Sequence, residues 1–390
     1  MSIFRQIWDV TRRELRLWRA RPLYLWGSVG VMALSALFFL TFFREGLPEK
    51  LPVGVVDLDG SSTSRNFTAQ LDATQLGTVV PFSTVTDARE RLDRGDICAF
   101  VVIPEHFNRE VQAFHCPKMG VYANTLYPVI GGALAYKDVM FLVNLTNGAV
   151  QREVLRAKGV SDKEIMGIIQ PLVLDAHNIG NGPTSYAYYL NNMVLAGILA
   201  MSIMLVVSYA LGAELKYGTS RHLLERAGGS VVTALQGKLL PYTLLFTLLG
   251  VSLQLLMFGI LRYPLQGSLG WMIVAMLAMV LAYESLAVFV VSLVPTLRLG
   301  VCISALYAVL GFSLAGFTLP VESLPAWIQG LSCLYPLRFY YQIFVREALY
   351  GTGLGGWWMA LVALLLFQLL PYTVLWRLKD AWKYQNYPRN

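Results

Sequence analysis

The residues that usually carry enzyme chemistry are few in this sequence and form no recognisable constellation. A phosphate-binding loop needs G-x-x-x-x-G-K-[ST], but Gly237 and Lys238 are followed by Leu239, and position 232 is Val. The H-E-x-x-H pattern of zinc helices is absent too. The histidines are scattered along the chain, at His106, His115, His177 and His222. The sequence therefore predicts no catalytic site, no metal site and no cofactor bound by this chain itself.

The cysteines make neither a CxxC pair nor the spacing of a zinc site. They are Cys98, Cys116, Cys302 and Cys333. Cys302 lies in an apolar run, which favours a small packing residue. Cys98 and Cys116 fall in one predicted domain, so an oxidising compartment would allow a disulfide between them.

Glu284 is an acidic residue inside a long apolar stretch. Charge at membrane depth is costly and usually has a function. Two interpretations stay open: Glu284 faces a cavity or a dimer seam, where it could bind a cationic substrate group, or it pairs with a basic residue near the inner end of its helix. Asn191 and Asn192, near the outer end of another apolar stretch, are weaker candidates for the lining of a translocation path.

The apolar stretches around these residues set the fold class. Of the 390 residues, 56% are hydrophobic and 14% charged, whereas soluble domains carry about 25% charged residues. A membrane helix needs about 20 apolar residues, so we predict an α-helical polytopic membrane protein with six transmembrane helices. The predicted spans are residues 22–43, 186–213, 239–261, 269–294, 299–317 and 357–376.

The first span is interpreted as a retained anchor and not as a signal peptide. Its apolar core is too long for a signal peptide, and it follows the cationic segment 1–21. The residues after it are Phe42-Phe43-Arg44-Glu45, which is no small-residue cleavage site.

Lysine and arginine in the short flanking segments predict the orientation. With six spans, the basic residues of 1–21, 214–238 and 377–390 fall on one side together with Arg298. That side is predicted to be cytoplasmic, which places both termini there. The net charge of +7 is then a topology signal, and binding to nucleic acid is not needed to explain it.

The long segment 44–185 then lies outside and has the pattern of a folded domain. Apolar runs of strand length alternate with charged helical stretches, which predicts a small α/β or α+β extracytoplasmic domain whose helical stalk leads to the second span. The predicted strands are residues 51–57, 78–82, 97–103 and 121–124. The predicted helices are residues 61–71, 87–94, 131–158 and 162–175.

The N-terminal segment is predicted to be an amphipathic helix lying in the membrane interface, with its cations toward anionic headgroups. The alternative is a plain positively charged flank that happens to be helical. One helical face carries Phe4, Ile7, Trp8, Thr11, Leu15 and Trp18, and the other carries Arg5, Arg12, Arg16 and Arg19.

The inner segment 214–238 is predicted to hold a short helix between two spans. Gly218 and Thr219 break the preceding helix, Thr219 or Ser220 can cap the next one, and Gly228-Gly229 end it. A partner would push on such a helix; the alternative is an ordinary solvated loop. The residues concerned are Gly218, Thr219, Arg221, His222, Leu223, Leu224, Glu225 and Arg226, with the two leucines on one face.

The third span follows at Gly237-Lys238-Leu-Leu-Pro241-Tyr242. Pro241 falls near the predicted first turn of this helix, where a missing N–H costs little. Residues 239–317 then hold the third, fourth and fifth spans.

The outer segment 318–356 is largely apolar but is interrupted by prolines. Helix breaks at membrane depth occur only where protein or a wet cavity satisfies the backbone. We therefore predict two short re-entrant helices, one before and one after Pro336, at an outer gate. The gate residues are Pro320, Pro325, Trp327, Pro336, Tyr340 and Tyr341.

Taken in chain order, the segments described above resemble the type-2 permease of ATP-binding-cassette (ABC) transporters over nearly the whole chain. The similar motifs are the N-terminal helix, Glu-x-x-x-Gly-Thr-x-x-x-Leu-Leu, Gly-Lys-Leu-Leu-Pro-Tyr, Gly-Phe-x-x-Pro-x-x-x-x-Pro-x-Trp-Ile and Pro-Leu-Arg-Phe-Tyr-Tyr. The outer segment, with Val-Gly-Val-Val-Asp-Leu-Asp-Gly-Ser-Ser, resembles the subgroup with a large extracytoplasmic domain. Gly228-Gly229-Ser230 departs from the Thr-Pro or similar turn that the family often has there.

The resemblance implies an exporter in the inner (cytoplasmic) membrane. Two permeases, identical copies or sisters, would bind two copies of an ATP-binding subunit, which holds the ATP and Mg. Residues 219–226 would be the coupling helix, residues 3–19 the connecting helix beside it, and residues 320–341 part of the outer gate. The cargo would be a small hydrophobic or amphipathic drug-like compound, passed to a periplasmic adaptor and an outer-membrane channel.

Three alternatives remain at the level of sequence. A lipid or polysaccharide exporter would belong to the same broad class, although polysaccharide permeases usually lack so large an outer domain. A membrane signalling or assembly scaffold with a ligand-binding outer domain would need no ATPase. An enzyme is the weakest alternative, because no constellation of residues supports it.

Overall fold

The computed structural model describes residues 2–43, 50–74, 77–113, 115, 117–124, 129–170, 185–317, 320–384 and 387. The chain divides into two compact units. The smaller unit is Leu47–His177, and the larger unit joins Met1–Gly46 to Asn178–Asn390.

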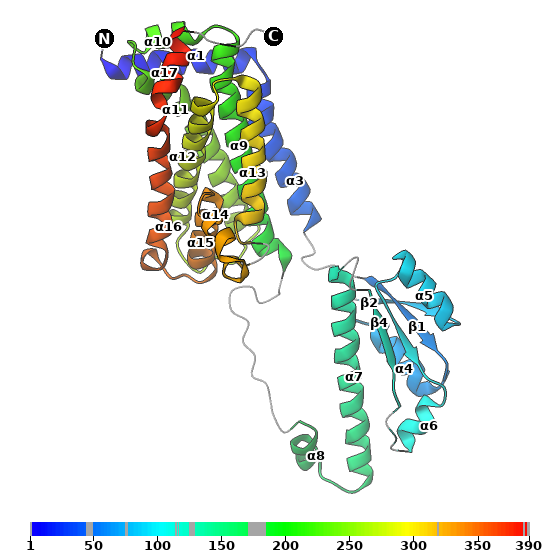
Figure 1. Ribbon diagram of the computed structural model, residues 1–390. Coiled ribbons are helices and arrows are strands. Elements are labelled where there is room, and N and C mark those ends of the chain that lie inside the picture. The colour runs from blue at the N-terminus through cyan, green and yellow to red at the C-terminus, as the bar shows by residue number, and fades with distance from the viewer. Residues whose placement is uncertain are drawn as a thin grey trace. The chain divides into compact units, whose positions relative to one another are not determined.

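The smaller unit is built on a four-stranded sheet in the order β2-β1-β3-β4 (Figure 1). The first three strands along the chain are parallel, and the last is antiparallel to β3. Parallel neighbours need a crossover connection, which α4 and α5 supply. The elements are β1 (Leu51–Asp57), α4 (Ser62–Asp72), β2 (Gly77–Phe82), α5 (Val85–Arg94), β3 (Ala99–Ile103) and β4 (Gly120–Ala123).

Helices cover both faces of this sheet, which explains why its strands are apolar runs and not alternating patterns. Val53 and Val55 face one cluster of buried residues, while Val56 and Phe100 face the other. Gly54 is required by this packing, since a Cβ there would lie 2.8 Å from Cβ of Phe100. All four predicted strands are found.

The described residues of the smaller unit form three further helices. They are α6 (Phe107–Gln112), α7 (Val129–Ala157) and α8 (Asp162–Ile169). The end of the predicted helix 162–175 lies outside the described residues. Cys116 also does, so a disulfide to Cys98 stays a prediction. Burial raises the pKa of the Cys98 thiol, which makes it a poorer nucleophile.

In the larger unit, six helical segments of the described chain are long and apolar enough to cross a membrane, which agrees with the predicted number of spans. They are Leu23–Phe42, Leu190–Lys216, Val231–Ile260, Leu269–Leu293, Leu297–Leu314 and Leu354–Thr373. The helices that form them are α2 (Leu23–Leu25), α3 (Val31–Phe42), α9 (Tyr186–Lys216), α11 (Val231–Gln254), α12 (Leu269–Leu293), α13 (Leu297–Leu314) and α16 (Leu354–Leu366). Short π-helical turns follow at Trp26–Gly30 and Leu255–Ile260, and a 3-10 turn, η5, at Phe367–Thr373.

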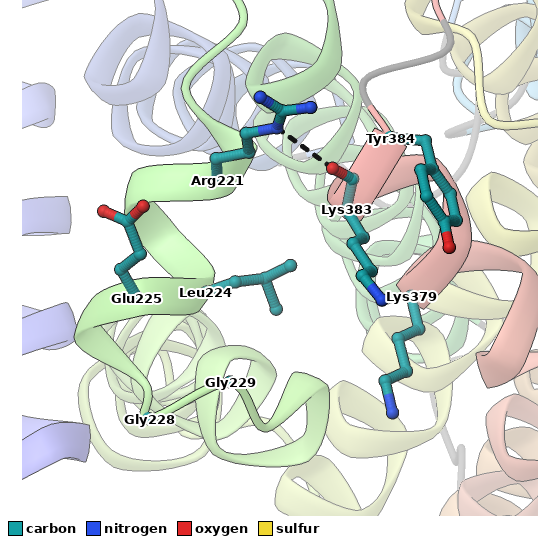
Figure 2. A pocket seen from close by; sticks show the side chains of 8 residues that line it. All are labelled: Arg221, Leu224, Glu225, Gly228, Gly229, Lys379, Lys383 and Tyr384. Atoms are coloured by element: carbon teal, nitrogen blue, oxygen red, sulfur yellow. Dashed lines mark hydrogen bonds between the residues drawn. The ribbon is translucent and has the colours of Figure 1, made fainter.

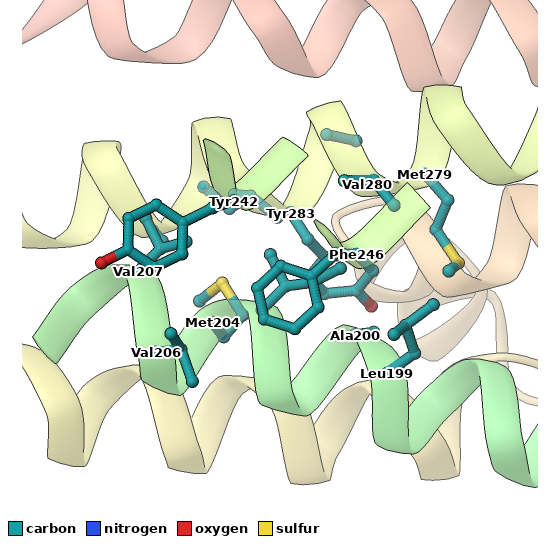
Figure 3. Close-up of a cluster of buried hydrophobic side chains, with 14 of the residues drawn as sticks. Leu199, Ala200, Met204, Val206, Val207, Tyr242, Phe246, Met279, Val280 and Tyr283 are labelled. Carbon is teal, nitrogen blue, oxygen red and sulfur yellow. The ribbon is translucent and has the colours of Figure 1, made fainter. Parts of the chain in front are cut away.

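The centre of the larger unit is formed by α9 and α12. Their apolar stretches are 72% and 67% buried within the protein, against 17% for the first and the last span. Buried side chains of α9, α11 and α12 gather there, among them Met204 of α9, Phe246 of α11 and Tyr283 of α12 (Figure 3). The remaining spans surround this centre.

The two ends of the larger unit carry different kinds of structure (Figure 1). One end carries three helices outside the spans, namely α1 (Ile3–Ala20), α10 (Ser220–Arg226) and α17 (Leu375–Tyr384). The opposite end carries α14 (Ala326–Ser332) and α15 (Pro336–Phe344), the short helices predicted before and after Pro336.

Glu347 connects helices at the end that carries α14 and α15. It lies in a π-helical turn after α15, Val345–Leu349, and is buried. Its Oε1 accepts a hydrogen bond from the backbone N–H of Ser268 at 2.7 Å, and its Oε2 accepts one from Nε1 of Trp357 at 2.7 Å. One acid therefore links the start of α12 to the start of α16.

Candidate functional site

The candidate site is the layer where α1, α10 and α17 meet the ends of the spans. Here α11 begins at Val231, not at residue 239 as predicted. Lys238 and Pro241 therefore lie inside this helix, and the prediction that Pro241 falls near its first turn is wrong. Inside the helix, both residues need partners that residues at a helix end would not need.

A side chain of α1 supplies the hydrogen-bond donor that is missing because of Pro241. Pro241 has no N–H, so the carbonyl of Gly237 loses its ordinary bond within the helix. The hydroxyl of Thr11 donates to that carbonyl at 2.8 Å. Gly237 also lets α1 approach closely, because a Cβ there would lie 2.7 Å from the carbonyl oxygen of Ile7 and 2.7 Å from Cβ of Val10.

The partners of Lys238 form a buried ion cluster, which we define as Arg13, Glu14, Glu214 and Lys238. The Nζ of Lys238 lies 2.7 Å from Oε2 of Glu14 and 2.8 Å from Oε1 of Glu214. The guanidinium of Arg13 donates two hydrogen bonds to Glu214, each of 2.8 Å. Two cations and two carboxylates thus balance in one buried place.

Two neutral donors complete the ion cluster. The hydroxyl of Tyr242 donates to Oε1 of Glu14 at 2.7 Å, and the hydroxyl of Thr219 donates to Oε2 of Glu214. Every carboxylate oxygen of the cluster therefore has a partner, as charged groups in an apolar place require. The cluster joins α1, the end of α9 and α11, and through Thr219 it reaches the start of α10.

Sequence reasoning missed this cluster. It treated Arg13 and Lys238 as topology signals, although both are paired here with carboxylates. A signal was available: Glu14 is an acid in a segment rich in arginine, on the helical face of Thr11 and Trp18. An acid at that place indicates a buried cation elsewhere in the chain.

We predict that Thr11→Val weakens the contact between α1 and α11. The valine keeps the shape of threonine but leaves the Gly237 carbonyl without a donor, which costs about 1–3 kcal/mol for a buried acceptor. Unfolding of the purified protein in detergent measures this loss. Thr41→Val is the control, because the Thr41 hydroxyl bonds within its own helix and is exposed. Equal stability of the two variants would contradict the assigned bond.

The other predicted residues of α1 separate into two groups. Trp18 is buried, with its ring packed edge-on against Tyr242 at a centroid distance of 4.9 Å. Phe4 and Trp8 are exposed, and so are Arg12 and Arg16. The apolar stripe predicted for α1 is therefore divided between the protein and its surroundings.

The short helix α10 has a buried side and an exposed side. Leu223 belongs to the core, and Leu224 is buried and points from α10 toward α17 (Figure 2). Within this chain, both leucines therefore pack against the larger unit itself. Gly228 and Gly229 end the helix with positive φ, as predicted. The exposed side is charged and consists of Arg221, His222, Glu225 and Arg226.

Thr219 stands at the N-cap of α10 but does not cap it with its side chain, because its hydroxyl is bonded to Glu214. Gly218 precedes it with a φ of 66°, a left-handed conformation that favours glycine. These two residues were predicted to break the helix before α10, and α9 does end at Lys216.

The C-terminal segment 377–390, predicted only as a tail, contributes α17. The hydroxyl of Ser220 donates to the Trp382 carbonyl at 2.9 Å, and Nε of Arg221 donates to the Lys383 carbonyl at 3.0 Å (Figure 2). A groove of about 710 Å³ lies between the two helices. It is lined by Arg221, Leu224, Glu225, Gly228, Gly229, Lys379, Lys383 and Tyr384.

The residues predicted for the outer gate lie together at the other end. Pro336 and Tyr340 are buried, and the Tyr340 hydroxyl accepts a hydrogen bond from Nε2 of Gln254 at 3.2 Å. Tyr341 beside them is half-buried. Pro320, Pro325 and Trp327 are exposed, with Trp327 71% accessible.

The candidates for a translocation lining do not lie together. Asn191 and Asn192 are buried near the start of α9, where Nδ2 of Asn191 donates to the Tyr263 hydroxyl at 2.9 Å. Glu284 lies on α12, and its Oε2 accepts a hydrogen bond from the Thr243 hydroxyl at 2.7 Å. Its partner is thus a hydroxyl of α11 and not a basic residue, which disfavours the second interpretation of Glu284.

Comparison with known proteins identifies the family of this chain. The model of the family described as "ABC-2 family transporter protein" matches residues 22–377. The probable multidrug ABC transporter permease YbhR of Escherichia coli strain K12 is 22% identical over 379 residues, covering 92% of this chain and 95% of the relative. The inner membrane transport permease YhhJ of the same strain is 23% identical over 309 residues, 78% of each chain. Because the family match covers most of its length, this chain belongs to the ABC-2 family of transporter proteins and is a type-2 ABC permease, the membrane-spanning subunit that works with an ATP-binding partner.

Proposed function

We propose that this permease exports small hydrophobic or amphipathic compounds across the inner membrane, using ATP that a separate subunit hydrolyses. The names of the two relatives, a multidrug permease and an inner membrane permease, support the cargo class and the location. The observation that carries the proposal is the ion cluster, because it connects the layer of short helices to two spans at once.

The ATP-binding partner docks on the charged side of α10 in this proposal. Arg221, His222, Glu225 and Arg226 supply that surface, while Leu223 and Leu224 hold the helix on the permease. Thr219 and the ion cluster then join α10 to α9, α11 and α1. A push on α10 moves the inner ends of two spans together, and this favours one of two arrangements of the permease.

We base the orientation in the membrane and the composition of the complex on where the charged residues and the helices lie. The end with α1, α10 and α17 faces the cytoplasm, because the lysines and arginines outside the smaller unit concentrate there. Exposed Phe4, Trp8 and Leu15 of α1 enter the lipid, with Arg12 and Arg16 at the headgroups. The smaller unit lies in the periplasm, where it meets an adaptor, and two permeases and two ATP-binding subunits form the transporter.

The test is co-purification of an ATP-binding subunit from native membranes in mild detergent. The unchanged protein should bring it down in stoichiometric amount. The double variant Glu225→Arg and Arg226→Glu should lose most of it, because like charges then meet across the contact. These residues are exposed, so the variant should keep its fold.

The matched control is Arg89→Glu with Asp93→Arg, an exposed charge swap on α5. It should leave co-purification unchanged. An ATP-binding subunit that stays bound to the α10 variant would place the contact elsewhere. No ATP-binding subunit with the unchanged, intact protein would overturn the exporter proposal and favour a membrane scaffold.

A further inference from the structure

Glu284 lines a pocket between α11, α12 and η5 that the docking of an ATP-binding subunit does not use. The pocket has a volume of about 480 Å³, within the range of about 300–1,000 Å³ of small-molecule sites. Leucine, valine and proline make up most of the wall. The polar residues that line it are Gln236, Thr243, Glu284, Ser285, Gln368 and Tyr372.

The acid in this wall is incompletely satisfied. Glu284 is 3% exposed, and Thr243 donates to one of its oxygens. The other oxygen, Oε1, is buried and has no hydrogen-bond partner among the described residues. No lysine or arginine is among the residues that line the pocket. An acid in such a place is favoured in its charged form only when a cation lies beside it, and the wall itself supplies none.

The remaining wall suits the rest of a cationic amphiphile. Its aliphatic side chains would cover an apolar body, and the side-chain oxygens of Gln236, Ser285 and Gln368 can accept N–H groups. The ring of Tyr372 at the wall can add a cation–π contact. An anion would be repelled by a charged Glu284, and an uncharged ligand would not balance its charge.

We propose that this pocket binds monovalent organic cations with a bulky apolar body, and that Glu284 is their counter-ion. The proposal deepens the exporter function, in that such cations would be its cargo, but binding itself needs no ATP-binding subunit. The pocket lies near the inner half of the spans, since Val232 of the first turn of α11 and Leu375 of α17 also line it.

The experiment measures binding of tetraphenylphosphonium to the full chain in nanodiscs of zwitterionic lipid, by equilibrium dialysis. Tetraphenylborate has the same shape and the opposite charge, and it serves as the matched ligand. After the uptake by empty nanodiscs is subtracted, the unchanged protein should bind the phosphonium and not the borate. Glu284→Gln should weaken phosphonium binding at least tenfold, while Glu284→Asp should stay within about threefold of the unchanged protein.

A second variant fills the pocket and keeps the acid. Leu281→Trp should also lose phosphonium binding, because Leu281 lines the same pocket. The proposal is overturned if Glu284→Gln or Leu281→Trp binds the phosphonium as tightly as the unchanged protein, or if both ligands bind alike, which indicates lipid-like occupation. None of these outcomes bears on co-purification of an ATP-binding subunit, so the two proposals fail separately.

Discussion

Replacing Lys238 by methionine should destabilise the larger unit by about 3–5 kcal/mol. Methionine has a similar length, but Glu14 and Glu214 would then share only Arg13 as a cation, in a place where Lys238 is now fully buried. Most of this loss of stability comes from leaving a buried carboxylate uncompensated, and a smaller part comes from the lost attraction to Lys238. The measurement is detergent-induced unfolding of the purified protein, followed by tryptophan fluorescence.

Two further variants separate charge balance from the change of side chain. The double variant Glu14→Gln and Lys238→Met removes one charge of each sign and keeps the bidentate pair of Arg13 and Glu214. It should recover most of the lost stability. Lys379→Met makes the same substitution at an exposed residue of α17, and it should have an effect within about 0.5 kcal/mol. A Lys238→Met protein as stable as the Lys379→Met protein would refute the buried ion cluster.

Gly237→Leu should release α1 from α11. Even a Cβ at this position would lie 2.7 Å from the Ile7 carbonyl oxygen, so a leucine side chain has no space while α1 stays in place. Overpacking of this kind costs about 1–3 kcal/mol and sometimes more, and it also separates Arg13 and Glu14 from their partners. Hydrogen exchange of the α1 amides should become faster, by about tenfold for each 1.4 kcal/mol.

Gly355→Leu is the matched control for this variant. Gly355 likewise belongs to a helix that contributes to a span, but a Cβ there meets no atom within 4 Å. Exchange of the α1 amides should then equal that of the unchanged protein. If α1 exchanges at the same rate in the Gly237→Leu and Gly355→Leu proteins, the close approach of α1 to α11 is not what holds it.

The spans and strands could be predicted from sequence because local requirements decide them. A bilayer needs about 20 apolar residues in a row, and a sheet covered on both faces needs short apolar runs between turns. The start of α11 could not be placed in this way. Lys238 looks like the end of a span until its partners are known, and Glu14 is 224 residues away from it.

The site was harder to predict than the fold, since its residues are brought together by packing. The pattern of α10 places Leu223 and Leu224 on one face, but it does not tell whether that face contacts the rest of this chain or a partner subunit. The sequence marked Glu284 as unusual without choosing between a pocket and an ion pair. The docking of α17 had a local signal in Leu378 and Trp382, which are four residues apart and both fully buried.

The ion cluster has a consequence for the order in which the chain is made. Arg13 and Glu14 leave the ribosome more than 200 residues before Lys238, an interval of roughly 10–45 s at about 5–20 residues per second. Until Glu214 is made, 24 residues before Lys238, α1 has neither of the α9 and α11 partners that later bury its polar face. Its exposed arginines and its Phe4 and Trp8 suit the headgroup layer. The membrane surface would thus bind α1 temporarily, until the third span has been made and can pack against it.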